Sequence, residues 1–211
     1  ATGALLRETS VLGALRRSVF RDLLAGAKDE GDLMHTNALE LLDGRCAQAQ
    51  PAFARGNVLL SSRVLSALFV LDPAAAGGRG EVLWAQRGTY RAQHDPRLLD
   101  DCRILLFDNS GAEPYSRVLE VELASPGEPA AERVIYSGSA EQRFYTKFCG
   151  AAARLPNGDT LITETGPGRA FEIAPDGRVV WEFVNPFEDQ GRVASIFELV
   201  RLPADAADAW R

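Results

Sequence analysis

The two histidines of this 211-residue chain, His35 and His94, are its best candidates for chemistry near neutral pH. Each precedes by a few residues a leucine, Leu41 or Leu98, that ends a predicted strand, so the two hold comparable places in consecutive units. An imidazole with one free ring nitrogen can act as a nucleophile or general base. We predict that both face one cavity as catalytic residues; the alternative is that each is an ordinary packed histidine.

Seven further side chains could bind a ligand beside the histidines. Amides and carboxylates can orient an imidazole, cationic groups can bind an anionic oxygen, and an aromatic ring can pack on an aryl group. The candidate binding residues are Asn37, Arg63, Asp95, Asn109, Arg117, Tyr145 and Lys147. Arg63 and Arg117 fall where strands are usually apolar, so each either points into the cavity or protects an exposed sheet edge.

A metal site is a second interpretation of the same histidines. His35 and His94, together with Asp95 or Glu164, would supply nitrogen and oxygen ligands. The two histidines do not have the tight spacing of ligands on one helix, so this signal is weak. No metal or other cofactor is expected.

Residues 154–183 form the clearest structural unit that could position these groups. Asp176-Gly177 is a hairpin dipeptide between alternating apolar residues, and Pro156-Asn157-Gly158-Asp159 suits a tight turn. Three short strands are predicted around these turns, at 160–163, 170–173 and 178–183. A single meander cannot bury both of its faces, so neighbouring sheets are required.

The same unit occurs twice more, at 35–86 and 94–138, with the same order of strands and turns. Leu41, Leu98 and Leu155 hold equivalent places about 57 residues apart. Four-stranded units of this period are typical of β-propeller blades, whose first strands line a central channel. We therefore predict an all-β fold with three four-stranded antiparallel blades, half of a six-bladed ring; the alternative is a meander sandwich with chance similarity.

The predicted boundaries divide the chain into a helical segment at 1–31, blades at 32–203 and a tail at 204–211. The first segment has apolar residues at helical spacing with arginines largely off that stripe. Within the blades, the limits are about 32–90, 91–140 and 141–187, followed by a closing strand at 195–202.

The charge and composition of the chain indicate which kinds of binding partner to expect. A basic amphipathic stretch at 4–28 can bind a membrane surface, but packing on the protein's own sheets is favoured. The net charge of −6 argues against nucleic acid. Because a propeller needs at least four blades, the missing ones are expected from another polypeptide, a second copy or a longer form of the chain. The chain starts at Ala1 without an evident signal sequence, so any targeting segment is expected to have been removed or not included.

The three cysteines, Cys46, Cys102 and Cys149, have neither CxxC spacing nor the density of a disulfide scaffold. Three buried free thiols are the favoured expectation. One disulfide with a leftover thiol is the alternative.

Several segments together resemble the bacterial arylsulfotransferase family. The matching segments, within about 32–187, are MHTNALELLDG, NVLLSSR, EVLW, QHD, ILLFDNSG, YSRVLEVEL, FYTKF, RLPNGDTLITE and GRAFEIAPDGRVVWEFVNP. The resemblance implies a six-bladed propeller, often exported to the periplasm or the cell exterior. It also implies transfer of a sulfuryl group from a phenolic sulfate ester to a phenol through a histidine, without a nucleotide donor. By this resemblance His35 corresponds to the histidine of the family's H-x-N segment and His94 to that of its Q-H segment.

The chain departs from the family's pattern at two places. The histidine that becomes sulfurylated in characterised members has no counterpart within Leu161–Gly168, and Ser110–Ala112 stands where those members carry an arginine. The prediction is an aryl sulfotransferase-like protein that uses His94 or His35 as nucleophile or general base. Arg117 and Lys147 are expected to bind the anionic oxygens and Asn37 to orient the histidine. The alternative is a non-catalytic propeller subunit that binds a ligand or completes its ring with another chain.

Overall fold

Three four-stranded antiparallel sheets make up most of the structure, a computed structural model that describes residues 3–5, 7–25, 27, 30–125, 129–203 and 206. Within each sheet the strands follow one another in sequence order, so each is a simple meander. Sheet 1 contains β1 (Thr36–Leu41), β2 (Val58–Ser62), β3 (Ala67–Asp72) and β4 (Glu81–Arg87). Sheet 2 contains β5 (His94–Leu98), β6 (Arg103–Ala112), β7 (Tyr115–Glu122) and β8 (Glu132–Ser137). Sheet 3 contains β9 (Ala151–Arg154), β10 (Thr160–Glu164), β11 (Arg169–Ile173) and β12 (Val179–Val184).

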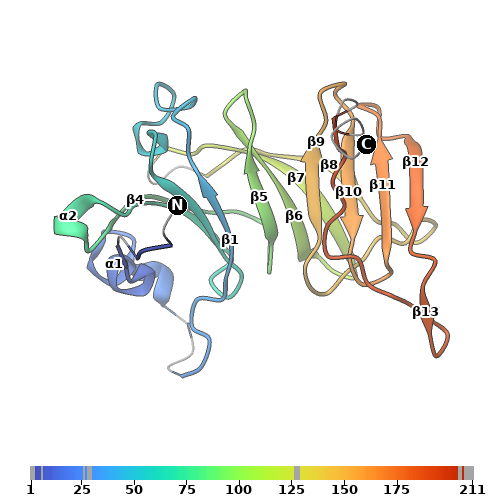
Figure 1. The fold of residues 1–211 in the computed structure, drawn as a ribbon, viewed down its shortest axis with the longest axis horizontal. Helices are drawn as coiled ribbons and strands as arrows, with labels where there is room; N and C mark the ends of the chain where they lie inside the picture. Colours follow the sequence, from blue (N-terminus) through green and yellow to red (C-terminus); the bar gives the residue numbers. More distant parts are fainter. Residues whose placement is uncertain are drawn as a thin grey trace.

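The first strands of the three sheets, β1, β5 and β9, lie next to one another, and the remaining strands of each sheet extend away from them (Figure 1). This is the arrangement of consecutive propeller blades. The predicted all-β fold with three four-stranded antiparallel sheets is confirmed. In the part of the chain that the structure describes, the sheets do not close into a ring.

The cores between the sheets explain why the middle strands are apolar on both faces. Along β6, Ile104 and Leu106 pack with sheet 1, whereas Leu105 and Phe107 pack with sheet 3. Side chains alternate between the two faces of a strand, so a sheet between two others needs apolar residues at every position. Each such side chain contributes about 1.5–3 kcal/mol when fully buried.

The N-terminal segment forms two short helices rather than one long one: α1 (Val11–Arg17) and the 3-10 turn η1 (Arg21–Leu24). Ser10 caps α1, its Oγ accepting a hydrogen bond from the Gly13 backbone N–H at 3.1 Å. Ala14 and Leu15 pack against sheet 1, as the amphipathic pattern predicts. Among the helices of the described residues, none is long and apolar enough to cross a membrane.

The remaining short elements lie in connections. The 3-10 turn η2 (Pro51–Phe53) lies in the β1–β2 connection, and α2 (Ala75–Gly78) lies in the β3–β4 connection. A hairpin of β13 (Glu188–Asp189) and β14 (Arg192–Val193) follows β12. The segment predicted as a closing strand, 195–202, contains no strand. It crosses sheet 3 and is held by isolated bonds, such as Leu199 N–H to Thr163 Oγ1 at 3.1 Å. Of the predicted tail at 204–211, all residues except Ala206 lie outside the described residues.

The favoured expectation of three free thiols is wrong, and the alternative of one disulfide with a leftover thiol is confirmed: Cys46 and Cys102 form a disulfide with Cα atoms 5.5 Å apart. Cys46 lies in the β1–β2 connection and Cys102 in the β5–β6 turn. The repeat places these loops at the same end of neighbouring sheets, so cysteines 56 residues apart in the chain meet. Cys149 is the free, half-buried thiol.

Candidate functional site

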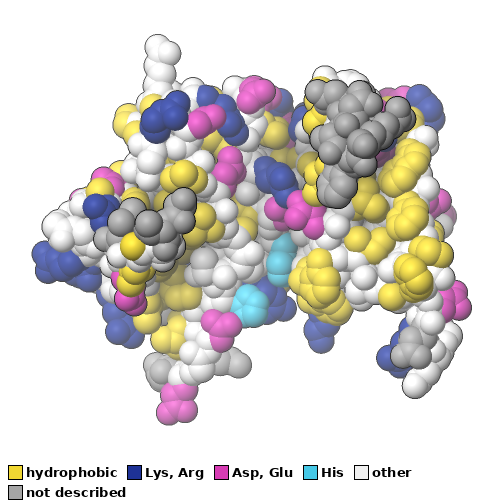
Figure 2. Space-filling view, in the orientation of Figure 1, with side chains coloured by type: hydrophobic (Ala, Val, Ile, Leu, Met, Phe, Trp, Pro, Cys, Tyr) yellow, Lys and Arg dark blue, Asp and Glu magenta, His cyan; other side chains and the backbone are white. Residues whose placement is uncertain are grey.

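The two histidines lie close together at the starts of inner strands. His35 directly precedes β1 and His94 is the first residue of β5. Figure 2 shows both imidazoles on the same face of the molecule, and the charge of His35 is near enough to lower the pKa of His94. The rings therefore share one surface, as a joint site requires.

The backbone before each inner strand repeats an unusual conformation. His35, Ala92 and Cys149, each six residues before the leucine at the end of its inner strand, have φ angles of 41°, 53° and 54°. Residues other than glycine rarely adopt such positive φ angles. His94 lies two residues after Ala92, and the residue two positions after His35 is Asn37. Asn37 is therefore the counterpart of His94 in sheet 1, and the two histidines are offset by two residues within their blades.

Hydrogen bonds fix the protonation of the His94 ring. Nδ1 lies 2.8 Å from Asn109 Oδ1 and 3.0 Å from the Ala92 carbonyl oxygen. The Asn109 amide is oriented because its Nδ2 donates to the carbonyl oxygens of Thr146, at 2.9 Å, and Cys149, at 2.8 Å. Both groups facing Nδ1 are therefore acceptors, so Nδ1 carries the proton and Nε2 holds the lone pair.

The surroundings of His94 also keep the ring neutral. His94 is only 9% exposed. Burial is the main cause that lowers the pKa of its ring below the ordinary 6.5, and the charges of Arg63 and His35 lower it further. Hydrogen bonds to Asn109 and Ala92 oppose this shift. Nε2 has one weak contact, from the Cys149 backbone N–H at 3.3 Å. Near neutral pH the ring is thus neutral, with its lone pair on Nε2.

Replacing Asn109 by aspartate is expected to raise the pKa of His94, because a carboxylate beside Nδ1 stabilises the imidazolium. In the wild type the pKa should lie below 6.5. Wild-type stability should therefore fall as the pH drops below 6.5, since the unfolded histidine then binds a proton that the folded one resists. NMR titration of the imidazole measures the pKa of His94 in the wild type and in the variant. The control Asn185→Asp adds the same charge beyond β12, and equal shifts in both variants would contradict the assignment.

His35 is oriented by a carboxylate that the sequence analysis missed. Its side chain is 45% exposed, with Nδ1 2.5 Å from Asp32 Oδ2, and its backbone N–H donates to Asp32 Oδ1 at 2.7 Å. The only sequence signal was an acidic residue three positions before a histidine, the spacing of a local side-chain-to-backbone bond. With Nδ1 bound to the carboxylate, Nε2 is the nitrogen available for proton exchange.

Asn37 and Asp95 connect the inner strands to one another. Asn37 Nδ2 donates to the Gln93 carbonyl oxygen at 2.7 Å, which joins β1 to the start of β5. Asp95 Oδ2 accepts from the Ala152 backbone N–H at 3.2 Å and from Arg97 Nε at 2.9 Å, which joins β5 to β9. Both side chains position the strands that carry the histidines.

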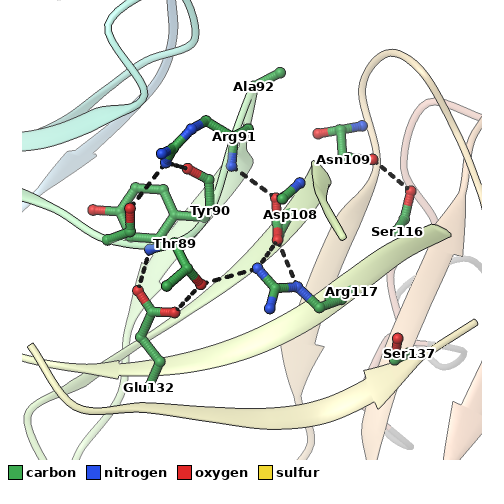
Figure 3. A network of polar contacts seen from close by, with 12 residues as sticks. Thr89, Tyr90, Arg91, Ala92, Asp108, Asn109, Ser116, Arg117, Glu132 and Ser137 are labelled. Atoms are coloured by element: carbon green, nitrogen blue, oxygen red, sulfur yellow. Dashed lines mark hydrogen bonds and ion pairs between the residues drawn. The ribbon is translucent and has the colours of Figure 1, made fainter. Parts of the chain in front are cut away.

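Arg117 is engaged in a partly buried polar network (Figure 3). Its Nε and Nη2 lie 2.8 Å and 2.5 Å from Asp108 Oδ2, and Nη2 also donates to Thr89 Oγ1 at 3.1 Å. Asp108 is fully buried, and its Oδ1 accepts from the Arg91 backbone N–H at 2.9 Å. This network attaches the connection between sheets 1 and 2 to sheet 2, so the guanidinium serves a structural ion pair.

Arg63 is differently placed. It lies in the turn after β2, its backbone N–H donates to the His35 carbonyl oxygen at 3.1 Å, and its charge acts on His94. Within the described ranges, no carboxylate pairs with its guanidinium. Arg63 therefore differs from Arg117, whose guanidinium is held by Asp108.

Tyr145 and Lys147 lie in the loop before β9. The Tyr145 backbone N–H donates to Glu164 Oε1 at 2.7 Å, and its side chain is half-buried. Lys147 is exposed and follows Thr146, whose carbonyl oxygen binds Asn109. The loop thus carries a cationic and an aromatic side chain past the amide that holds His94.

The metal interpretation finds no support in the geometry. Across the described part of the chain, no three His, Cys, Asp or Glu side chains are grouped so as to hold a metal ion.

Comparison with known proteins places the chain in a family. A family model described as Arylsulfotransferase (ASST) matches residues 1–186. Among solved structures, a protein of unknown function from Bacteroides caccae matches with a TM-score of 0.37 and 17% identity, over 61% of this chain. The match spans only 42% of that protein. No curated protein matches significantly. The family match confirms the resemblance drawn from the sequence segments, and this chain belongs to the arylsulfotransferase family.

Proposed function

We propose that this chain transfers sulfuryl groups between phenolic compounds and that His94 accepts the group on Nε2. The observation that carries the proposal is the fixed, neutral imidazole: Asn109 holds the proton on Nδ1, which leaves the lone pair on Nε2. A histidine nucleophile needs this combination of one free nitrogen and one oriented nitrogen.

The proposed reaction has two steps. In the first, Nε2 of His94 attacks the sulfur of an aryl sulfate; an N–S bond forms, the S–O bond to the ring breaks, and the departing phenolate takes up a proton. In the second, the oxygen of an acceptor phenol loses its proton and attacks the sulfur, and the N–S bond breaks. The proposed proton carrier is His35, whose Nδ1 is held by Asp32. As in phosphoryl transfer, positioning and neutralisation of the equatorial oxygens supply much of the catalysis.

The direct test is transfer from 4-nitrophenyl sulfate to phenol, followed by rapid quenching and mass spectrometry. We expect release of 4-nitrophenol and one added SO₃ unit on the peptide that contains His94. Transfer with the unit on another residue would reject His94 as the acceptor. No transfer to any phenol would favour the alternative, a non-catalytic propeller subunit.

Replacing Arg63 by glutamine is expected to lower kcat/KM for the aryl sulfate by about 10- to 100-fold, because a charge-assisted contact to the sulfuryl oxygens is lost. Steady-state kinetics with 4-nitrophenyl sulfate measures the change. Arg16→Gln is the matched control, since Arg16 is exposed on α1. Equal kinetics in the two variants would contradict the role of Arg63.

Both end sheets expose apolar side chains, which supports the proposal that further blades pack there. Leu39 and Leu41 on β1 and Trp181 and Phe183 on β12 are all exposed, and apolar side chains are prominent over sheet 3 in Figure 2. Exposed apolar surface of this kind usually marks an interface. The proposed occupant is a second copy or another polypeptide, and light scattering of the purified protein separates a monomer from either assembly.

The compartment proposed from the family resemblance is the periplasm or the cell exterior. The Cys46–Cys102 disulfide supports this proposal, because such bonds persist mainly in oxidising compartments.

A further inference from the structure

We infer that a second ligand site, for an organic anion, lies where sheets 2 and 3 meet, at the end of the inner strands opposite His94. A cavity of about 540 Å³ opens there, beside the β5–β6 and β9–β10 turns, which lie at the same edge of the sheets in Figure 1. Pockets of this volume hold small organic ligands. Leu98 in its wall is four residues beyond His94, at the other end of β5.

Three guanidinium groups in the cavity wall converge on one buried carboxylate. Glu120, which is 2% exposed, accepts at Oε2 from Arg133 Nη2 at 2.7 Å and from Arg103 Nη1. Its Oε1 accepts from Arg154 Nη2 at 2.5 Å. The carboxylate comes from β7, and the three arginines come from β8, β6 and β9, respectively. Glu120 thus fixes cationic groups from two sheets around one cavity.

The cavity is lined by three arginines and three carboxylates, Asp100, Asp101 and Glu120, so the formal charges balance but are unevenly placed. Arg103 is also bound by Asp101, whose carboxylate contacts its Nε at 3.1 Å, so these two side chains neutralise each other. Arg133 and Arg154 remain, and they share the single negative charge of Glu120. The positive charge is therefore concentrated at Arg133 and Arg154, where a bound anion would meet two guanidiniums that share one carboxylate.

The two remaining guanidiniums also keep hydrogen-bond donors available. An arginine has five N–H donors; Arg133 uses its Nη2 for Glu120, and Arg154 additionally donates from Nη1 to the Gly158 carbonyl oxygen at 3.0 Å. The other aspartate in the wall, Asp100, has a fully exposed side chain, and its partner Arg45 at 3.6 Å is also bound by Asp43 and Glu40. The charge of Asp100 is therefore screened by solvent, whereas Glu120 is buried.

The residues that line the cavity also indicate which chemical class of ligand fits it. Leu98, Leu155 and Pro156 line it together with the arginines. Planar guanidiniums favour carboxylate, sulfate or phosphate heads, and the apolar wall favours an aromatic or aliphatic body. The ligand class is thus a small amphipathic oxyanion. This inference does not depend on the proposed sulfuryl transfer, because none of its residues contacts His94.

Phenyl phosphate is a suitable probe, measured by isothermal titration calorimetry on the full chain at fixed ionic strength. We expect saturable binding that weakens about tenfold or more in Arg133→Gln, because a charge-assisted contact is lost. Arg133 is 61% exposed, so this variant should fold, and its melting temperature verifies that. Arg16→Gln, with the same charge change on α1, should bind as the wild type does.

A third variant separates this cavity from the histidine site, which could also bind phenyl phosphate. Binding that persists in His94→Ala and weakens in Arg133→Gln supports the inference. Binding that weakens in His94→Ala and persists in Arg133→Gln assigns the ligand to the histidine site and overturns it. Equal affinity in all variants, or no saturable binding, overturns it as well. Inorganic phosphate should bind more weakly than phenyl phosphate, and equal affinity would overturn the amphipathic class.

Discussion

Replacing His94 by alanine is expected to lower the rate of sulfuryl transfer by about a thousandfold or more, the scale of loss when an enzyme's nucleophile is removed. The lone pair on Nε2 forms the bond to sulfur in the proposed reaction. The measurement is the turnover of 4-nitrophenyl sulfate with phenol as acceptor. Because the loss falls on the chemical step, kcat should decrease far more than KM changes.

A matched variant separates chemistry from folding. Alanine leaves the buried Asn109 oxygen without its donor, which costs about 1–3 kcal/mol of stability. His94→Gln can still donate an N–H toward Asn109 but offers no nucleophilic nitrogen, so it should fold well and remain inactive. His35→Ala should lose less, about a hundredfold, as expected for a proton carrier. Full activity in both His94 variants would remove this residue from the mechanism.

The sequence was informative about the fold because each blade repeats the same local pattern. Turn residues such as Asp176-Gly177 and the leucines spaced by about 57 residues mark strand ends without any knowledge of the neighbours. Segment 195–202 could not be judged in this way, because an apolar stretch forms a strand only where a sheet edge is available to pair with it.

The site was less predictable because its contacts join distant residues. The positions of His35 and His94 pointed to one face of the molecule, yet Asn109 as the partner of Nδ1 depends on how β5 and β6 are paired. Likewise, Arg117 faces Asp108 across β6 and β7, a pairing that a single strand does not reveal. The Cys46–Cys102 bond required knowing that loops one repeat apart meet.

Replacing Cys102 by serine is expected to lower the free energy of unfolding by about 4 kcal/mol, the loop-closure value for a bridge between residues 56 apart. The bond constrains the unfolded chain, and in the folded state it joins sheet 1 to sheet 2 at the end opposite His94. Urea denaturation of the wild type, with and without reductant, and of the variant measures the loss. Cys149→Ser is the control and should change the value by about 0.5 kcal/mol or less.

The same variant tests how the histidines are held together. The strands β1, β5 and β9 are also joined by the Asn37 and Asp95 contacts, which lie nearer to the rings than the disulfide does. The Cys102 variant should therefore unfold at lower urea but keep the lowered pKa of His94 while folded. A pKa that returns to the ordinary value would mean that the bridge, rather than these contacts, holds the two sheets in register. An unchanged unfolding free energy would instead show that the bond adds no constraint beyond the packed core.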